Sequence, residues 1–226
     1  MERIDSVPTT PPEQIIPADS FSANLVASQI KVNPTSEALR ALAKAFPNVD
    51  AANMLSNLHQ FLGSKHNYCI VGSTAMFIHA CLVSKADRTF PSPPNDLDLV
   101  VNYPGMQRTE YMAGNTQEFG LTKEQSRPGR YHYTDPETQK TVRIDLIPES
   151  RQSFEPFLRN AQWVDDFQLA SIDDLLEASK EQISSKSLSA NGLTEEKRMA
   201  IQARLDYFEK KLVPEPPALN ASSSGE

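Results

Sequence analysis

The chain has 226 residues, 39% of them hydrophobic, which suits one globular domain with appendages. Its formal net charge is −7 and its pI is about 5.2, so the overall composition does not favour a polynucleotide-binding protein. No stretch approaches the roughly 18 apolar residues of a membrane span, and residues 1–20 show neither the basic start nor the apolar h-region expected of a secretory signal peptide. We therefore expect a cytoplasmic protein without a membrane partner; delivery into another cell stays open.

The two ends of the chain differ in composition from the middle. Residues 1–34 are rich in Pro, Ser and Thr and predict a disordered leader, because they bury too little apolar surface to offset the entropy of ordering. Residues 213–226 repeat this composition and predict a disordered tail. Between them, residues 35–150 predict a core domain and residues 151–212 a helical C-terminal subdomain.

The first part of the core predicts three helices and one strand. Ser36 is a suitable N-cap for a helix, and Gly63 is a suitable C-cap for the next one. The expected elements are a helix from Ser36 to Phe46, a helix from Val49 to Leu62, a strand from Asn67 to Val71 and a helix from Thr74 to Val83.

The rest of the chain predicts a strand, a polar helix, a hairpin and then helices. The expected elements are a strand from Asp96 to Asn102, a turn at Tyr103-Pro104-Gly105, a helix from Arg108 to Phe119, a hairpin of Arg130–Thr134 with Lys140–Ile147, a capping box at Ser171 and a last helix from Thr194 to Leu212. Together they predict an α+β (α/β) fold: a small mixed sheet flanked by helices, with a helical C-terminal part.

Three aspartates stand out on two of these strands. Side chains alternate along a strand, so Asp96 and Asp98 share one face while Leu97 and Leu99 share the other. Asp145 lies in a second alternating segment, opposite to its apolar neighbours. If the two strands are neighbours, three carboxylates converge on one face. A solvated strand face is the alternative interpretation of each aspartate taken alone.

Three clustered carboxylates repel one another and call for compensating positive charge. Hard divalent cations with oxygen ligands are the obvious candidates, and Mg²⁺ prefers a few carboxylates together with substrate phosphates. We therefore predict Mg²⁺ or Mn²⁺ at Asp96, Asp98 and Asp145, with a nucleoside triphosphate as substrate.

The Gly72-Ser73 step lies where a predicted strand gives way to a helix. Backbone N–H groups at such a helix N-terminus suit an anion such as a phosphate, although Gly-Ser is also a common turn and cap. Arg127, Arg130 and Arg143 are near Asp145 in the sequence. They are candidate triphosphate or acceptor contacts, or they balance nearby acids.

These motifs resemble the nucleotidyltransferase superfamily that shares the DNA polymerase beta catalytic fold, and most closely its AbiEii-like, small bacterial toxin-type branch. The resemblance covers roughly residues 60–210, and the motifs occur in the family's order: Val71-Gly72-Ser73-Thr74-Ala75-Met76, Asp96-Leu97-Asp98-Leu99, Arg143-Ile144-Asp145-Leu146 and the weaker Ala170–Leu176 segment followed by Lys180.

The resemblance implies a catalytic core at residues 35–150, with Asp96, Asp98 and Asp145 as catalytic metal ligands. It also implies nucleotide contacts from Gly72, Ser73, Thr74 and Lys180, and Arg143 is added as a nucleotide contact on account of its charge. Lys180 is one residue out of the branch's register, so a solvated helix position is an equal alternative. The reaction expected is transfer of a nucleoside monophosphate from the triphosphate to a hydroxyl of tRNA, a protein or a small molecule, in a toxin or effector with a partner or antitoxin protein. The competing hypotheses are a non-catalytic nucleotide- or partner-binding protein of the same fold and a plain helical interaction protein.

Overall fold

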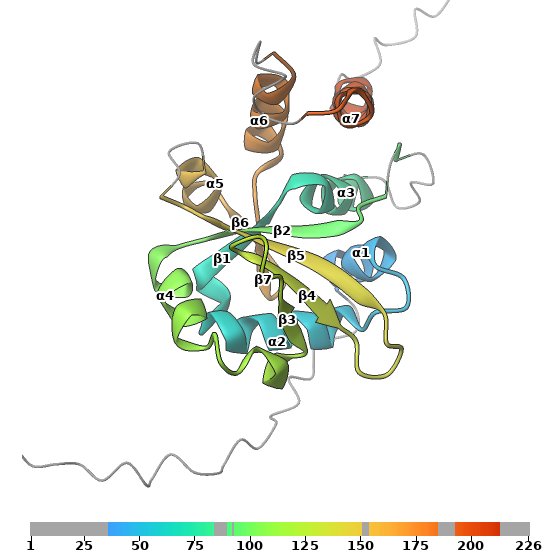
Figure 1. Cartoon of the computed structure of the whole chain (residues 1–226). Coiled ribbons are helices and arrows are strands. Elements are labelled where there is room, and N and C mark those ends of the chain that lie inside the picture. The colour runs from blue at the N-terminus through green and yellow to red at the C-terminus, as the bar shows by residue number, and fades with distance from the viewer. Residues whose placement is uncertain (1–35, 84–89, 92, 151–153, 185–192, 213–226) are drawn as a thin grey trace, which may run out of the picture. The chain divides into compact units, whose positions relative to one another are not determined.

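A computed structural model describes residues 36–83, 90, 91, 93–150, 154–184 and 193–212. The predicted leader (residues 1–34) and the predicted tail (residues 213–226) lie outside these residues. The described chain forms a mixed seven-stranded sheet flanked by helices, which confirms the α+β fold class (Figure 1). The sheet is larger than expected, because three short strands join the four that the sequence predicts.

The bounds of the elements are as follows. The helices are α1 (Glu37–Ala45), α2 (Ala51–Leu62), α3 (Gly72–Val83), α4 (Tyr103–Tyr111), α5 (Glu155–Arg159), α6 (Ile172–Ser184) and α7 (Glu195–Leu212), with 3₁₀ turns η2 (Lys65–Asn67) and η3 (Thr116–Phe119). The strands are β1 (Tyr68–Val71), β2 (Asp96–Val101), β3 (Leu121–Lys123), β4 (Arg130–Thr134), β5 (Thr141–Pro148), β6 (Gln162–Val164) and β7 (Phe167–Leu169).

The strand order is β3-β4-β5-β2-β1-β7-β6. The centre of the sheet is mixed: β2 is parallel to β5 and antiparallel to β1, while β1 is parallel to β7. The outer pairs β3–β4, β4–β5 and β6–β7 are antiparallel. This order places β2, which carries two of the aspartates, directly beside β5, which carries the third.

Helix ends follow the capping residues in the sequence. The Ser36 hydroxyl accepts a hydrogen bond from Leu39 N at 3.0 Å, and Gly63 ends α2 in the left-handed conformation at φ 82°. The second helix begins later than the expected Val49, because the Asp50 carboxylate caps the free N–H groups of the first turn. The predicted helices at both sites are therefore confirmed, with one boundary moved.

The region after β2 differs from the prediction. Tyr103-Pro104-Gly105 is the first turn of α4 and not a separate turn, because Asn102 caps the helix by accepting from Gly105 N at 3.0 Å. Proline is compatible with a first helical turn, where its missing N–H has no intrahelical partner. The expected continuous helix to Phe119 is also wrong, since α4 ends at Tyr111 and the separate turn η3 follows.

The C-terminal part is not helical throughout. The hairpin β6–β7 adds two strands to the sheet, and Leu169 of β7 pairs with Ile70 of β1. Each strand has three residues, too few for an alternation to be recognised in the sequence. The capping box at Ser171 is confirmed, because Asp174 N donates to the Ser171 hydroxyl at 3.2 Å at the start of α6.

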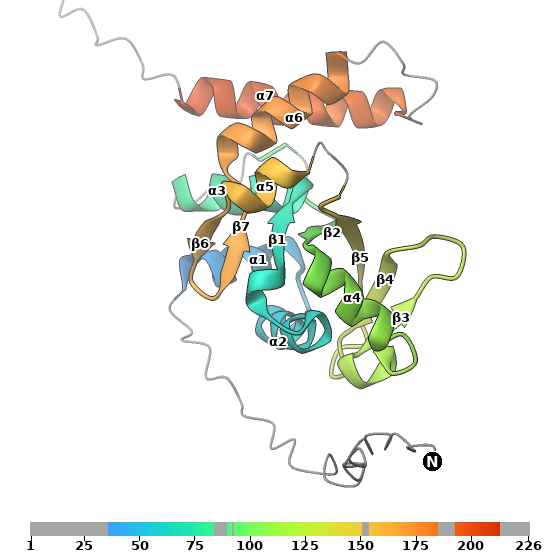
Figure 2. The ribbon, with the colours of Figure 1, turned by 90° about the vertical axis from the view of Figure 1, so that its left-hand side faces the viewer.

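Helices cover the sheet on both sides (Figures 1 and 2). The helix α2 lies on one side, where Phe61 packs edge-on against Tyr131 of β4 with ring centroids 5.3 Å apart. On the other side lie α3 and α5, with α6 and α7 beyond them. Phe90 connects these layers through ring contacts with Phe77 of α3 and Phe208 of α7. Within the described residues, every helix is too short or too polar to cross a bilayer.

Candidate metal centre

The three carboxylates predicted from the sequence lie together where β2 and β5 run side by side. Asp98 of β2 is the register partner of Asp145 of β5, and Asp96 lies on the same face. One oxygen of each carboxylate lies within 4.8 Å of the other two. Leu97 and Leu99 are fully buried on the opposite face. The predicted convergence of acidic side chains from two adjacent strands is therefore confirmed.

Two arginines neutralise part of this negative charge. Arg130 of β4 donates from Nε and Nη2 to the two Asp145 oxygens, at 2.6 and 2.8 Å, in a bidentate pair. Arg143 of β5 pairs through Nη2 with Oδ2 of Asp96. Both arginines thus balance nearby acids, which was one of the two interpretations left open by the sequence. Among the described residues, no Lys or Arg forms an ion pair with Asp98.

The carboxylates of the triad differ in their electrostatic surroundings. Burial raises the pKa of the Asp98 carboxyl to about 7, and the negative charges of Asp96 and Asp145 act in the same direction. Burial also opposes ionisation of Asp145, but the hydrogen bonds and charge of Arg130 outweigh it and lower the pKa of Asp145. Without a further cation, the charged form of Asp98 is therefore destabilised by its surroundings.

Gly72 allows the backbone to pass close to the Asp98 carboxylate. Val71, the last residue of β1, is the register partner of Asp98, so the chain enters α3 directly beside the triad. Gly72 has φ +66°, and a Cβ at this position would collide with Oδ2 of Asp98. Glycine is therefore required here both by the left-handed backbone conformation and by the close approach of the carboxylate.

The two residues that follow Gly72 have different roles. Ser73 lines a cleft above the triad, as a ligand-contacting residue must. Thr74 is fully buried, and its hydroxyl donates to the backbone carbonyl of Asp96 at 2.6 Å. The hydroxyl of Thr74 thus fixes the start of α3 against β2. A contact between the backbone of Thr74 and a nucleotide stays a prediction.

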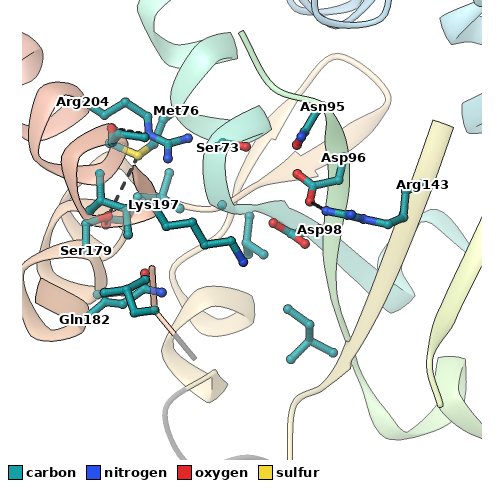
Figure 3. Close-up of a pocket in the computed structure, with 18 of the residues that line it drawn as sticks. Ser73, Met76, Asn95, Asp96, Asp98, Arg143, Ser179, Gln182, Lys197 and Arg204 are labelled. Carbon is teal, nitrogen blue, oxygen red and sulfur yellow. Dashed lines mark hydrogen bonds and ion pairs between the residues drawn. The ribbon is translucent and has the colours of Figure 1, made fainter. Parts of the chain in front are cut away.

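The cleft has a volume of about 770 Å³ and lies between the sheet and the two C-terminal helices. Its acidic side carries Asp96 and Asp98, and Figure 3 shows Arg143 reaching Asp96 from β5. The remaining walls mix apolar and polar side chains. They include Met76, Phe154, Phe157, Ser179, Gln182, Lys197 and Arg204.

The cationic residues of the C-terminal helices that line the cleft are Lys197 and Arg204, and not the predicted Lys180. Lys180 of α6 is exposed, pairs with Glu209 at 3.4 Å and is not among the residues that line the cleft, so its contact with a nucleotide stays a prediction without support from this geometry. Lys197 and Arg204 of α7 do line it, and Figure 3 shows Lys197 extending toward Asp98. Burial lowers the pKa of Arg204, an effect opposed by the charges of Asp96 and Asp98.

Lys197 and Arg204 are not among the site residues predicted from the sequence, because the prediction of this helix depends on its apolar positions alone. The available signal was the helical spacing of Lys197, Ala200, Ile201 and Arg204, which all face the cleft. This spacing places the four residues on one face of the helix, but it does not indicate which element that face meets.

The donor set fits a divalent cation. Three carboxylates supply the hard oxygen ligands that Mg²⁺ and Mn²⁺ prefer, at mutual distances that one or two ions can bridge. Two of the three carboxylates, Asp96 and Asp98, line the cleft together with Gly72. The arrangement can therefore hold metal ions on one side of a bound anion, with Lys197 and Arg204 on the other.

Comparison with known proteins adds no relative to this picture. No protein-family model, no curated protein and no solved structure matches the chain. The family resemblance thus stays a prediction, and the geometry of the site is what supports a function for this protein.

Proposed function

We propose that the chain is a metal-dependent nucleotidyltransferase, which moves a nucleoside monophosphate from a nucleoside triphosphate to an acceptor hydroxyl. The observation that carries this proposal is the convergence of three carboxylates from β2 and β5 beside the N-terminus of α3, two of which, Asp96 and Asp98, line one side of a cleft whose other side is cationic. A triphosphate with divalent metal ions matches both sides, since the ions bind the carboxylates and the phosphates meet the cations.

Asp96, Asp98 and Asp145 would hold Mg²⁺ or Mn²⁺. These ions supply charge neutralisation for the attacking oxygen and for the leaving pyrophosphate. The chain's own groups hold the phosphates: the N–H groups at the start of α3, the hydroxyl of Ser73, and the side chains of Lys197 and Arg204.

Asp145 serves the acceptor side of the reaction. Its lowered pKa keeps the carboxylate charged at neutral pH, so it orients the acceptor hydroxyl and the metal rather than acting as a strong base. The Met76, Phe154 and Phe157 side chains give the cleft an apolar wall that suits a nucleobase. A hydroxyl of tRNA, of a protein or of a small molecule can take part in the same chemistry.

A second candidate function is non-catalytic nucleotide binding. One observation favours it: Arg130 engages both oxygens of Asp145, and Arg143 engages Asp96, so two cations already compensate the triad. A site neutralised in this way would bind a nucleotide through its cations without needing a metal ion. The two functions therefore differ in the metal dependence of binding.

Thermal denaturation with each nucleoside triphosphate, with and without Mg²⁺, tests the proposal. A ligand at about 100 times its dissociation constant stabilises the fold by about 2.7 kcal/mol. We expect this stabilisation to need both Mg²⁺ and a triphosphate, and to be lost in Asp96→Asn/Asp98→Asn. The matched control is Glu118→Gln/Glu137→Gln, which removes two exposed carboxylates outside the cleft and should respond as the wild type does.

Label transfer then completes the test. A triphosphate labelled at the α-phosphate is incubated with RNA, protein and small-molecule fractions, and the label is expected to enter one of them. Binding that is equal with and without Mg²⁺, and no transferred label, would favour the non-catalytic function. The absence of any nucleotide effect would leave the three carboxylates without a ligand and refute both.

A further inference from the structure

We infer that Arg143 exchanges partners during binding: it occupies Asp96 before metal binds, and moves to the triphosphate when metal takes its place. The inference rests on the proposed function and assigns Arg143 the role of coupling the two ligands. Arg143 pairs with Asp96 through Nη2, and its Nε lies 3.8 Å from Oδ2 of Asp145. Its guanidinium thus occupies the region between two of the three carboxylates that would bind a cation.

A guanidinium and a divalent ion compete for the same carboxylate lone pairs. The Asp96 oxygen that accepts from Arg143 is one of the two hard donors that this carboxylate offers to a metal. Metal binding at that oxygen without nucleotide breaks the Arg143–Asp96 pair and leaves the guanidinium only the longer approach of its Nε to Asp145. The pair consequently weakens binding of the metal alone.

Arg143 is also placed to find a new partner. It is one of the residues that line the cleft, its side chain is 37% exposed, and its Nε is buried without a hydrogen-bond acceptor. A guanidinium binds phosphate oxygens in a forked geometry. With a triphosphate in the cleft, Asp96 turns to the metal and Arg143 to a phosphate, so both ions gain partners in one step.

Arg130 provides the contrast. It is 17% exposed, is absent from the cleft wall, and lies between the bidentate partner Asp145 and Glu124, whose Oε2 is 3.8 Å from Arg130 Nε. Carboxylates on both sides hold it in place, so it orients Asp145 in every state. The exchange is therefore assigned to Arg143 and not to Arg130.

Binding free energies are linked reciprocally, so this exchange makes metal and triphosphate each raise the other's affinity. The signature is a substitution with effects of opposite sign. Arg143→Met removes the competitor for Asp96 and should strengthen binding of Mn²⁺ alone, by about threefold for a partly exposed pair. It also removes a phosphate contact, and should weaken binding of the Mn²⁺–tripolyphosphate complex by at least about tenfold.

Isothermal titration calorimetry on the full chain measures both arms, with Mn²⁺ alone and with preformed Mn²⁺–tripolyphosphate as probes. Arg143→Gln is a second variant that must show the same opposite signs. Arg159→Met is the matched control: it removes an exposed arginine of α5 outside the cleft and should change neither affinity. Urea unfolding shows whether each variant is folded.

The outcomes separate the two proposals. Affinities that fall in both arms would make Arg143 a residue that merely positions the carboxylates, and unchanged affinities would remove its role; either overturns the exchange while leaving the proposed function intact. If the wild type binds neither probe, or if Asp98→Asn binds both as tightly as the wild type, the proposed function fails and the exchange fails with it.

Discussion

Replacing Asp98 by asparagine should stabilise the metal-free protein, and the gain should grow with pH. Asparagine has nearly the shape of a protonated aspartic acid and carries no charge, so it removes the cost of holding a carboxylate beside Asp96 and Asp145. The pKa of Asp98 rises from 3.8 to about 7 on folding. Since one pKa unit corresponds to about 1.4 kcal/mol, the full cost at high pH is on the order of 4 kcal/mol.

The direction of the pH effect follows from proton linkage. Below pH 3.8 the carboxyl is protonated in both the folded and the unfolded chain, so its contribution to stability is fully present. As the pH rises toward 7, the unfolded chain releases the proton while the folded chain retains it, and stability is lost. Above about pH 7 both states are ionised and the loss is complete.

Urea unfolding with a chelator at pH 5 and pH 8 measures this difference. The free energy of unfolding of Asp98→Asn, minus that of the wild type, should increase by about 2–3 kcal/mol between these two values. Glu118→Gln, an exposed change in η3, is the control and should give a difference independent of pH. Parallel pH profiles for wild type and Asp98→Asn would refute the account of Asp98 as a buried carboxylate opposed by its neighbours.

Three further substitutions, with Lys180→Met as a fourth for comparison, test the residues around the site. Gly72→Ala should lower the free energy of unfolding by at least about 1–2 kcal/mol, because of its positive φ, and weaken Mn²⁺ binding through the collision with Asp98; calorimetry and urea unfolding measure both. Thr74→Val loses a buried hydrogen bond and should cost about 1–2 kcal/mol in urea unfolding. Lys197→Met should weaken Mg²⁺-dependent triphosphate binding at least about fivefold, whereas Lys180→Met should not; equal effects would contradict the assigned cleft wall.

The sequence predicts the triad well because its signal is local. Asp96 and Asp98 lie in a strand of six residues, long enough for the alternation of acidic and apolar side chains to be visible. Asp145 lies in an equally clear strand of eight residues. The pairing of β2 with β5 is only a hypothesis from the sequence, since nothing local to either strand specifies its neighbour. The buried apolar faces of both strands, with Leu97 and Ile144 in register, supply the reason.

The cations of the cleft show why the rest could not be predicted. Leu175 is the buried residue of α6, and Ser179 one turn later faces the cleft, which turns the adjacent Lys180 outward. Which face of a helix meets a cleft depends on how its apolar residues pack against other elements, and those partners lie far away in the sequence. The three-residue strands β3, β6 and β7 were missed for a related reason, because they are stabilised by pairing and burial and not by a local pattern.

The stability terms of this site argue against carboxylates that cluster by chance. Surface aspartates that serve no ligand are normally hydrated and far from one another, and they place little demand on the backbone. Here the fold holds a carboxylate with a raised pKa, and one oxygen of it lies within 4.8 Å of an oxygen of each of two further carboxylates. Each feature lowers the stability of the metal-free chain, and a cation at the triad relieves the electrostatic part of that cost. Proteins tolerate such local costs chiefly at functional sites, so the same features that make Asp98→Asn stabilising support a ligand-binding function over an incidental acidic surface.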